Sequence, residues 1–250
     1  MKKFAIMVAL ALPLAFASCG DDNDTTITLD QTAVNLEYGK SVKVKASEGG
    51  VAWGSSNEFV ATVNDKGEIE AEHVGTAVIT ATKNGATAKC TVTVTATNNN
   101  FTLPILNWGA SVNDVKSAVE TQFKDLSLLT GSADGLTYTQ PAQAYPWYLY
   151  IFKNGGLAGS MLAVDEDMDE SLDLEGFIEQ RYEEVDETEE GFVYVNANTI
   201  GEATLAVIYS YDADLEAVTA TWMLPEHTKA GIYDKMVVRD LKTMLKGAKK

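Results

Sequence analysis

Residues 75–94 read GTAVITATKNGATAKCTVTV, and this stretch decides the fold of the first part of the chain. Apolar side chains alternate with threonine in residues 90–94, and a similar pattern occurs in residues 78–81, so each segment has one face to bury. Lys83-Asn84-Gly85 is a turn signal between the two segments. The stretch therefore predicts two β-strands separated by a turn.

The same pattern extends toward the N-terminus. Valines alternate with lysines in residues 41–46, and further turn signals occur at Tyr38-Gly39-Lys40 and Asn64-Asp65-Lys66-Gly67. Short alternating segments at this spacing are typical of a small all-β sandwich. We predict such a sandwich over residues 27–96.

A series of short motifs in this region is specific to one family. The motifs lie at residues 27–30, 53–57, 60–63, 67–69, 75–81 and 90–94. In this order they resemble the group 2 bacterial immunoglobulin-like domain. Gly54 stands where the family usually has serine, and the segment 47–52 is shorter than usual. The resemblance implies a rigid spacer without catalysis. We expect Trp53 and Cys90 to be core residues and His73, the lone histidine of the domain, to be a surface side chain.

The N-terminus has the features of a secretory signal. Lys2 and Lys3 precede an apolar stretch at residues 4–17, which is too short to span a bilayer comfortably. Phe16-Ala17-Ser18-Cys19 resembles the lipobox of bacterial lipoproteins, which implies removal of residues 1–18 and a lipid on Cys19. The alternative is a secreted protein in which Cys19 is incidental.

Residues 19–26 form a polar tether. Gly20-Asp21-Asp22-Asn23-Asp24 resembles the acidic export signal of surface lipoproteins in Bacteroides-like bacteria. The resemblance implies an outer-membrane lipoprotein, held to the membrane by its lipid and exposed at the cell surface. The formal net charge of −17 makes nucleic acid an unsuitable partner. Cys90 has no partner for an intrachain disulfide if Cys19 is lipidated.

A second domain follows the asparagine-rich linker at residues 97–100. Ser111 to Asp114 form a capping box before a helix, and Lys153-Asn154-Gly155-Gly156 joins two strands, at 145–152 and 157–164. Further helices and strands are predicted at 174–185, 192–196, 203–211, 217–223 and 232–245. We expect residues 101–250 to form an α+β domain, an antiparallel sheet with helices on one face.

One aromatic cluster offers candidate ligand contacts. Alternation places Trp147 on one face of its strand and Tyr148 and Tyr150 on the other. If helices cover only one face, the other set is exposed and can stack on sugar rings or anchor a protein. The alternative is that both faces are buried.

Two acidic runs bear on metal binding. Asp165, Asp167 and Asp169 are spaced as in a calcium loop, but Glu170 and Gly176 replace the glycine and glutamate of such a loop. We expect no metal there, only a solvated loop, and a second wet loop at residues 183–190. No cofactor is expected.

Sequence motifs for catalysis are missing. The chain has no nucleophile elbow, zinc-protease motif or phosphate-binding glycine loop, and His73 and His227 lie in different domains. We therefore predict a non-enzymatic surface lipoprotein whose spacer presents a binding domain for a glycan or protein, for adhesion or recognition. Two alternatives stay open. One is a periplasm-facing lipoprotein that assists envelope assembly or inhibits a hydrolase, since residues 108–115 faintly resemble SmpA-type and β-lactamase-inhibitor-like domains; the other is a carboxylate hydrolase.

Overall fold

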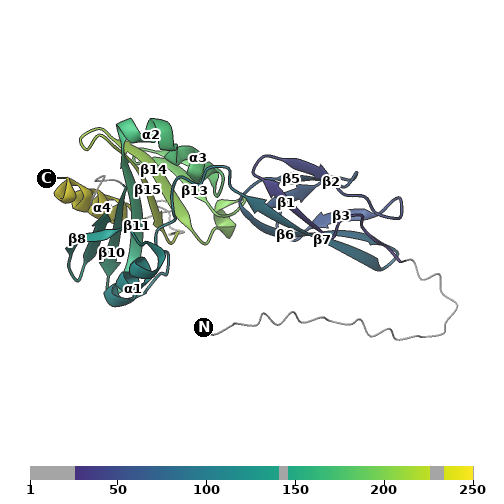
Figure 1. The fold of residues 1–250 in the computed structure, drawn as a ribbon, viewed down its shortest axis with the longest axis horizontal. Helices are drawn as coiled ribbons and strands as arrows, with labels where there is room; N and C mark the ends of the chain where they lie inside the picture. The colour runs from purple at the N-terminus through teal and green to yellow at the C-terminus, as the bar shows by residue number, and fades with distance from the viewer. Residues whose placement is uncertain (1–25, 141–145, 226–233, 250) are drawn as a thin grey trace, which may run out of the picture.

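The computed structural model describes residues 26–140, 146–225 and 234–249. Two bodies lie end to end, a small β-sandwich and a larger domain built on one broad sheet (Figure 1). The segment 96–100 passes from the first body to the second. The chain is therefore mostly β, with short helices packed on the second body.

The first domain consists of two facing sheets. One sheet has the order β1 (Ala33–Glu37), β7 (Ala86–Thr95), β6 (Gly75–Lys83) and β3 (Ala52–Ser55), and the other has β2 (Ser41–Lys43), β5 (Glu68–Ala71) and β4 (Ala61–Val63). β1 pairs with β7 in parallel, and the other described pairs of this domain are antiparallel. The predicted immunoglobulin-like sandwich is confirmed.

The hairpin of β6 and β7 is the centre of this sandwich. Asn84 and Gly85 have φ values of 51° and 83°, and Lys83 pairs with Ala86, so the turn contains two residues. Cys90 is fully buried between the sheets. Trp53 is half-buried, and its ring covers Gly67, where a Cβ would lie 2.7 Å from the ring.

The second domain contains an eight-stranded antiparallel sheet in the order β12-β13-β14-β15-β11-β10-β9-β8. The strands are β8 (Ser127–Gly131), β9 (Gly135–Thr139), β10 (Trp147–Lys153), β11 (Gly156–Asp165), β12 (Glu183–Thr188), β13 (Gly191–Val195), β14 (Ala206–Asp212) and β15 (Ala217–Met223). A 3₁₀ turn, η1 (Ile200–Glu202), precedes β14. The predicted β10–β11 hairpin is confirmed, with Asn154 and Gly155 at positive φ.

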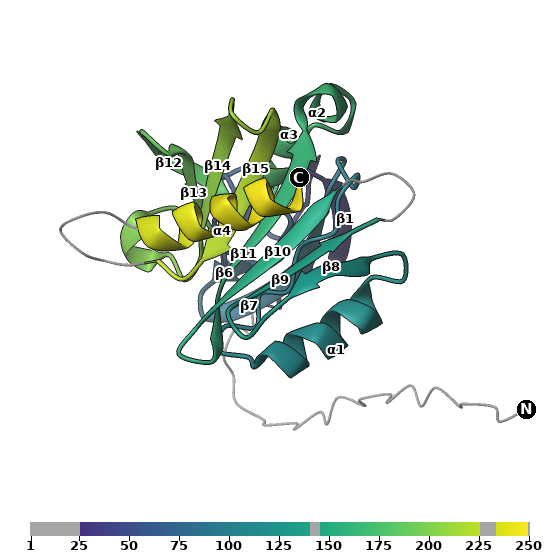
Figure 2. The same cartoon turned by 90° about the vertical axis from the view of Figure 1, so that its left-hand side faces the viewer.

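Helices cover both faces of this sheet, so the prediction of helices on one face is wrong. α1 (Val112–Gln122), α2 (Glu166–Leu172) and α3 (Leu174–Glu179) belong to one side. α4 (Lys235–Ala248) lies across the other (Figure 2). The physical reason is that the central strands are buried on both faces: every residue of β15 is buried, and so are the first six of β10.

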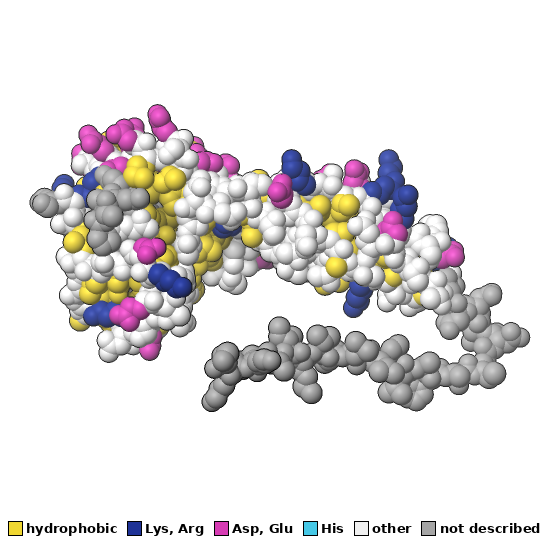
Figure 3. Space-filling view, viewed as in Figure 1, with side chains coloured by type: hydrophobic (Ala, Val, Ile, Leu, Met, Phe, Trp, Pro, Cys, Tyr) yellow, Lys and Arg dark blue, Asp and Glu magenta, His cyan; other side chains and the backbone are white. Residues whose placement is uncertain are grey.

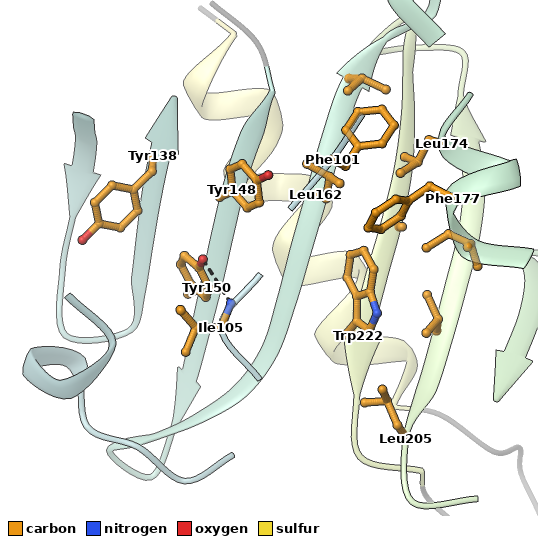
Figure 4. Close-up of a cluster of buried hydrophobic side chains, with 14 of the residues drawn as sticks. Phe101, Ile105, Tyr138, Tyr148, Tyr150, Leu162, Leu174, Phe177, Leu205 and Trp222 are labelled. Carbon is orange, nitrogen blue, oxygen red and sulfur yellow. Dashed lines mark hydrogen bonds between the residues drawn. The ribbon is translucent and has the colours of Figure 1, made fainter. Parts of the chain in front are cut away.

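The larger of the two cores lies under α1 and α3. Trp222 is fully buried, and its indole N–H donates to the hydroxyl of Tyr182 at 3.0 Å. The backbone N–H of Ile105 donates to the hydroxyl of Tyr150 at 3.4 Å (Figure 4). The predicted capping box of α1 is confirmed, with Ser111 as its N-cap. The indole N–H of Trp222 and the hydroxyls of Tyr182 and Tyr150 thus have hydrogen-bond partners inside the core.

Two acidic segments predicted as loops are regular structure. Residues 166–172 form α2, and residues 183–188 form the edge strand β12 rather than a wet loop or the end of a helix. An edge strand rich in carboxylates is a usual protection against pairing with other chains. Figure 3 shows Asp and Glu side chains gathered along the part of the second domain that carries α2 and α3.

Candidate functional site

The aromatic residues suggested as ligand contacts are all buried. Trp147, Tyr148 and Tyr150 are 5%, 3% and 0% exposed. The predicted alternation is confirmed, because Trp147 packs on the α4 side and the two tyrosines pack in the other core (Figure 4). Exposure of one set required helices on one face only; helices cover both faces, so the alternative, burial of both sets, is the one observed. These rings hold the sheet together and offer no face to a ligand in solution.

Two of the three aspartates of the acidic run accept hydrogen bonds within the fold. Asp165 accepts a hydrogen bond from the ammonium group of Lys249 at 2.6 Å. Asp169 accepts one from the backbone N–H of Leu174 at 2.9 Å, where α2 meets α3. Asp167 lies between them on α2. Among the described residues, no group of three or more His, Cys, Asp or Glu side chains is arranged to hold a metal ion.

The N-terminal predictions fall outside the described residues. Residues 1–18, Cys19 and most of the tether precede residue 26. Within the part of the chain that the structure describes, no helix is long and apolar enough to cross a bilayer.

The two domains are joined by hydrogen bonds that centre on Gln180. Its side-chain oxygen accepts from the backbone N–H groups of Thr97 and Asn98 at 2.7 and 3.0 Å. Its backbone oxygen accepts from the N–H of Val74, in the first domain, at 2.8 Å. Gln180 is only 7% exposed, so these bonds form where water does not compete freely.

The asparagine segment is part of the junction. Asn98 is 9% exposed, and its amide donates to the backbone oxygens of Leu172 and Asp173 at 3.3 and 2.7 Å. Arg181 lies over the ring of Phe177 and donates to the backbone oxygen of Asn98 at 3.4 Å. Residues 97–100 therefore hold the second domain at a defined orientation to the first.

His73 is buried at this junction, so the expectation of a surface side chain is wrong. It is 7% exposed, its ring stacks on Phe59 with centroids 4.1 Å apart, and its Nδ1 lies 2.7 Å from the backbone oxygen of Phe59. Its Nε2 lies 3.4 Å from a carboxylate oxygen of Glu183 on β12. The second domain covers this histidine, and nothing in the first domain's sequence alone indicates that.

A polar groove opens beside the same contact. It has a volume of about 320 Å³ and is walled by the β3–β4 loop of the first domain and the β13–β14 loop of the second. The lining residues are Ser55, Ser56, Asn57, Glu58, Phe59, Asn196, Ala197, Asn198 and Glu202. We call it the junction groove. Sequence reasoning missed it because its walls lie about 140 residues apart in the chain.

Hydrogen bonds fix both walls of the junction groove. On the first wall, the hydroxyl of Ser56 accepts from the N–H of Val78 at 2.8 Å. On the second, the side-chain oxygen of Asn196 accepts from the N–H groups of Thr204 and Leu205 at 3.0 and 2.9 Å. The loops are thus shaped before any ligand arrives, which lowers the entropic cost of binding.

Other groups of the groove are available to a ligand. The side-chain amides of Asn57 and Asn198 are exposed and have no hydrogen-bond partner among the described residues. Glu58 and Glu202 add carboxylates, and none of the described lining residues is a lysine, arginine or histidine. An amide both donates and accepts, as a hydroxyl does, so the groove is suited to a neutral ligand with many hydroxyl groups.

Comparison with known proteins identifies the first domain. Residues 24–94 match the model of the bacterial Ig-like domain (group 2). This confirms the resemblance found in the sequence and defines the class of the N-terminal domain. No curated protein matches the chain.

Solved structures resemble the chain only distantly. Domains 5–6 of the S-layer protein SbsC share 14% identity over 82% of this chain and 86% of that one, with a TM-score of 0.25. Human protocadherin-24 EC1-2 shares 10% identity over 84% and 91%, with a TM-score of 0.25. A SusE-like surface located polysaccharide binding protein of Bacteroides thetaiotaomicron shares 16% over 56% and 30%, with a TM-score of 0.21. Such low scores assign no function to the second domain.

Proposed function

We propose that this protein is a non-enzymatic, surface-anchored glycan-binding protein that holds a neutral saccharide in the junction groove. The observation that carries the proposal is the preformed polar groove, with the amides of Asn57 and Asn198 on opposite walls and without hydrogen-bond partners in the described ranges. Lipid on Cys19 anchors the chain, and the immunoglobulin-like domain carries the second domain away from the membrane.

The size and lining of the groove favour a saccharide over a protein partner. Its volume of about 320 Å³ lies near the lower end of small-ligand pockets, whereas a specific protein interface buries roughly 1,600 Å². Its carboxylates disfavour an anionic sugar. The ring of Phe59 is partly buried and is fixed by its stack on His73, and its accessible part offers an apolar surface of the kind that packs on sugar C–H groups.

A binding role is favoured over hydrolysis by the state of the carboxylates. No Asp or Glu in the described ranges is among the fully buried residues, and Glu58 and Glu202 in the groove are exposed. A glycosidase needs a general acid whose pKa is raised. Partial burial raises the pKa of Asp169 and of Glu175, but neither residue lines the junction groove. The exposed carboxylates of the groove are better suited to accepting hydrogen bonds from hydroxyl groups.

The test is titration of the full chain with neutral hexasaccharides by isothermal calorimetry. The panel contains malto-, cello-, xylo-, manno- and laminarihexaose. At least one is expected to bind, and Asn57→Ala and Asn198→Ala are each expected to weaken it about 2- to 10-fold, the worth of one or two hydrogen bonds. Asn35→Ala and Asn113→Ala, at exposed asparagines away from the groove, serve as matched controls. Binding that survives Asn57→Ala, Asn198→Ala and the double variant would place the saccharide elsewhere.

The anchoring part of the proposal has its own experiment. Intact cells that express the protein are treated with protease, and the chain is followed by immunoblot with a periplasmic protein as the intactness control. Degradation supports surface display. Protection with an intact control would place the protein on the periplasmic side and would count against a surface role.

A further inference from the structure

A second and larger cavity lies beside α4. It has a volume of about 510 Å³ and is bordered on one side by Lys235, Arg239, Lys242 and Lys246 of that helix. Spacings of four, three and four residues put these side chains on one stripe of the helix. The other side is formed by the β14–β15 turn and by Glu190. We call this cavity the α4 groove.

The charges across the α4 groove are unevenly matched. Lys235 lies 3.1 Å from Glu190, and Lys242 lies 3.8 Å from Asp212, so two of the four cations reach carboxylates across the groove. Among the described residues, the carboxylate that Arg239 reaches is that of its chain neighbour Asp240, at 3.6 Å, and the Arg239 side chain is 69% exposed. Such an exposed pair contributes little, which leaves the guanidinium group free to exchange partners.

The floor of the α4 groove is apolar. Leu215 is 8% exposed and Val238 is 2% exposed, and both line the cavity. Met236 also lines it and is 54% exposed, among the highest values of the large apolar side chains described. Methionine is a flexible apolar surface that adapts to the shape of a ligand. The groove therefore combines an apolar strip with an available planar cation.

From this arrangement we infer that the α4 groove binds an amphipathic anion. The carboxylate or sulfate head of this ligand pairs with Arg239, and Lys246, two turns further along the same stripe, adds a second positive charge. Its apolar tail lies over Met236 and Leu215. A guanidinium group binds such heads through two parallel hydrogen bonds, which an ammonium group does not offer. The volume lies within the usual range of small-molecule sites. This site is independent of the junction groove and takes a ligand of different chemistry.

Three probes with the same tail and different heads test the inference. The full chain is titrated with octanoate, octylamine and octyl glucoside, each below the concentration at which it forms micelles, and amide shifts are followed by NMR. Octanoate is expected to bind roughly tenfold more tightly than octylamine, the worth of one charge-assisted pair. Arg239→Glu is expected to reverse this order, and Met236→Gln is expected to weaken octanoate without reversing it. Lys89→Glu, the same charge change on an exposed residue of β7, is expected to leave the order unchanged.

The outcomes separate the head group from the tail. Equal affinities for the three probes, no binding of any, or an Arg239→Glu variant that still prefers octanoate would each overturn the inference. Urea unfolding of every variant shows whether α4 stays docked. Binding of neutral hexasaccharides is expected to be unaffected by Arg239→Glu, so failure at one groove is distinguished from failure at the other.

Discussion

The side-chain oxygen of Gln180 accepts a hydrogen bond from the backbone N–H of Asn98 at 3.0 Å, across 82 positions of the chain. This contact joins the segment that leaves the sandwich to the end of α3. Because Asn98 is buried, its N–H depends on the Gln180 oxygen for a hydrogen bond, and the same oxygen also accepts from the N–H of Thr97. The immunoglobulin-like domain is therefore held to the second domain by specific contacts as well as by the chain.

Removing the Gln180 side chain is expected to loosen this junction. Gln180→Ala leaves the N–H groups of Thr97 and Asn98 without their acceptor, at a cost of about 1–3 kcal/mol in the free energy of unfolding. Urea unfolding measures the loss, and small-angle X-ray scattering measures the spread of domain orientations. Gln31→Ala, at a partly exposed glutamine of the first domain, is the control. An unchanged scattering profile and stability in Gln180→Ala would contradict a junction held by this side chain.

The packing of α4 depends on Gly159. A Cβ at this position would collide with Val237 and would lie 3.2 Å from Ile151 and 3.3 Å from Leu241. Gly159→Ala is therefore expected to lower the free energy of unfolding by about 1–3 kcal/mol through overpacking. Gly201→Ala, where a Cβ meets nothing within 4 Å, is the matched control. Thermal and urea unfolding compare the two, and equal stabilities would show that α4 does not pack so closely on β11.

Asp234, the N-cap of α4, is expected to make the free energy of unfolding fall at acid pH. Burial tends to raise the pKa of Asp234, but its hydrogen bonds to Lys153 and to the N–H groups of Met236 and Val237 outweigh burial and lower it. A carboxyl group whose pKa is lower in the folded state stabilises the fold above its unfolded pKa of about 3.9 and loses this contribution as pH falls.

Asp234→Asn keeps an N-cap side chain but removes the charge. The variant is expected to be less stable than the parent by about 0.5–1.5 kcal/mol at pH 7, and this difference is expected to shrink below about pH 4. Urea unfolding at pH 7, 5 and 3.5 measures it. Asp240→Asn, at the weaker surface pair with Arg239, should show a smaller effect at pH 7. A stability difference that grows as pH falls would contradict a lowered pKa for Asp234.

The buried aromatic residues of β10 are expected to affect stability and not ligand affinity. Tyr150→Ala should cost about 3–5 kcal/mol, since it removes a fully buried ring. Tyr150→Phe should cost about 1–3 kcal/mol, because the N–H of Ile105 loses its acceptor. Unfolding experiments measure these losses. Calorimetry on the folded Tyr150→Phe variant is expected to give an unchanged saccharide affinity. A loss of affinity without unfolding would show that Tyr150 contributes to ligand binding after all.

Local sequence signals predicted much of the fold. The capping box at Ser111 and the Asn-Gly turn at 154–155 act within a few residues, and both form as expected. Residues 127–131 and 135–139 were missed as strands. Every residue of β8 is exposed, so this strand has no buried face, and its sequence does not need the alternation of apolar and polar residues that predicts a strand. The acidic strand β12 was missed because Asp and Glu are poor strand formers, and pairing with β13 overrides that preference.

The sequence by itself determined the immunoglobulin-like sandwich, because its strands, turns and core positions follow one another within about seventy residues. Only the tertiary structure decided that helices cover both faces of the second sheet, that His73 is buried against Glu183, and that two distant loops enclose a groove. The physical reason is the distance along the chain over which each kind of interaction acts. Alternation and turn chemistry act between near neighbours, whereas burial and the meeting of loops depend on which surfaces the whole chain brings together.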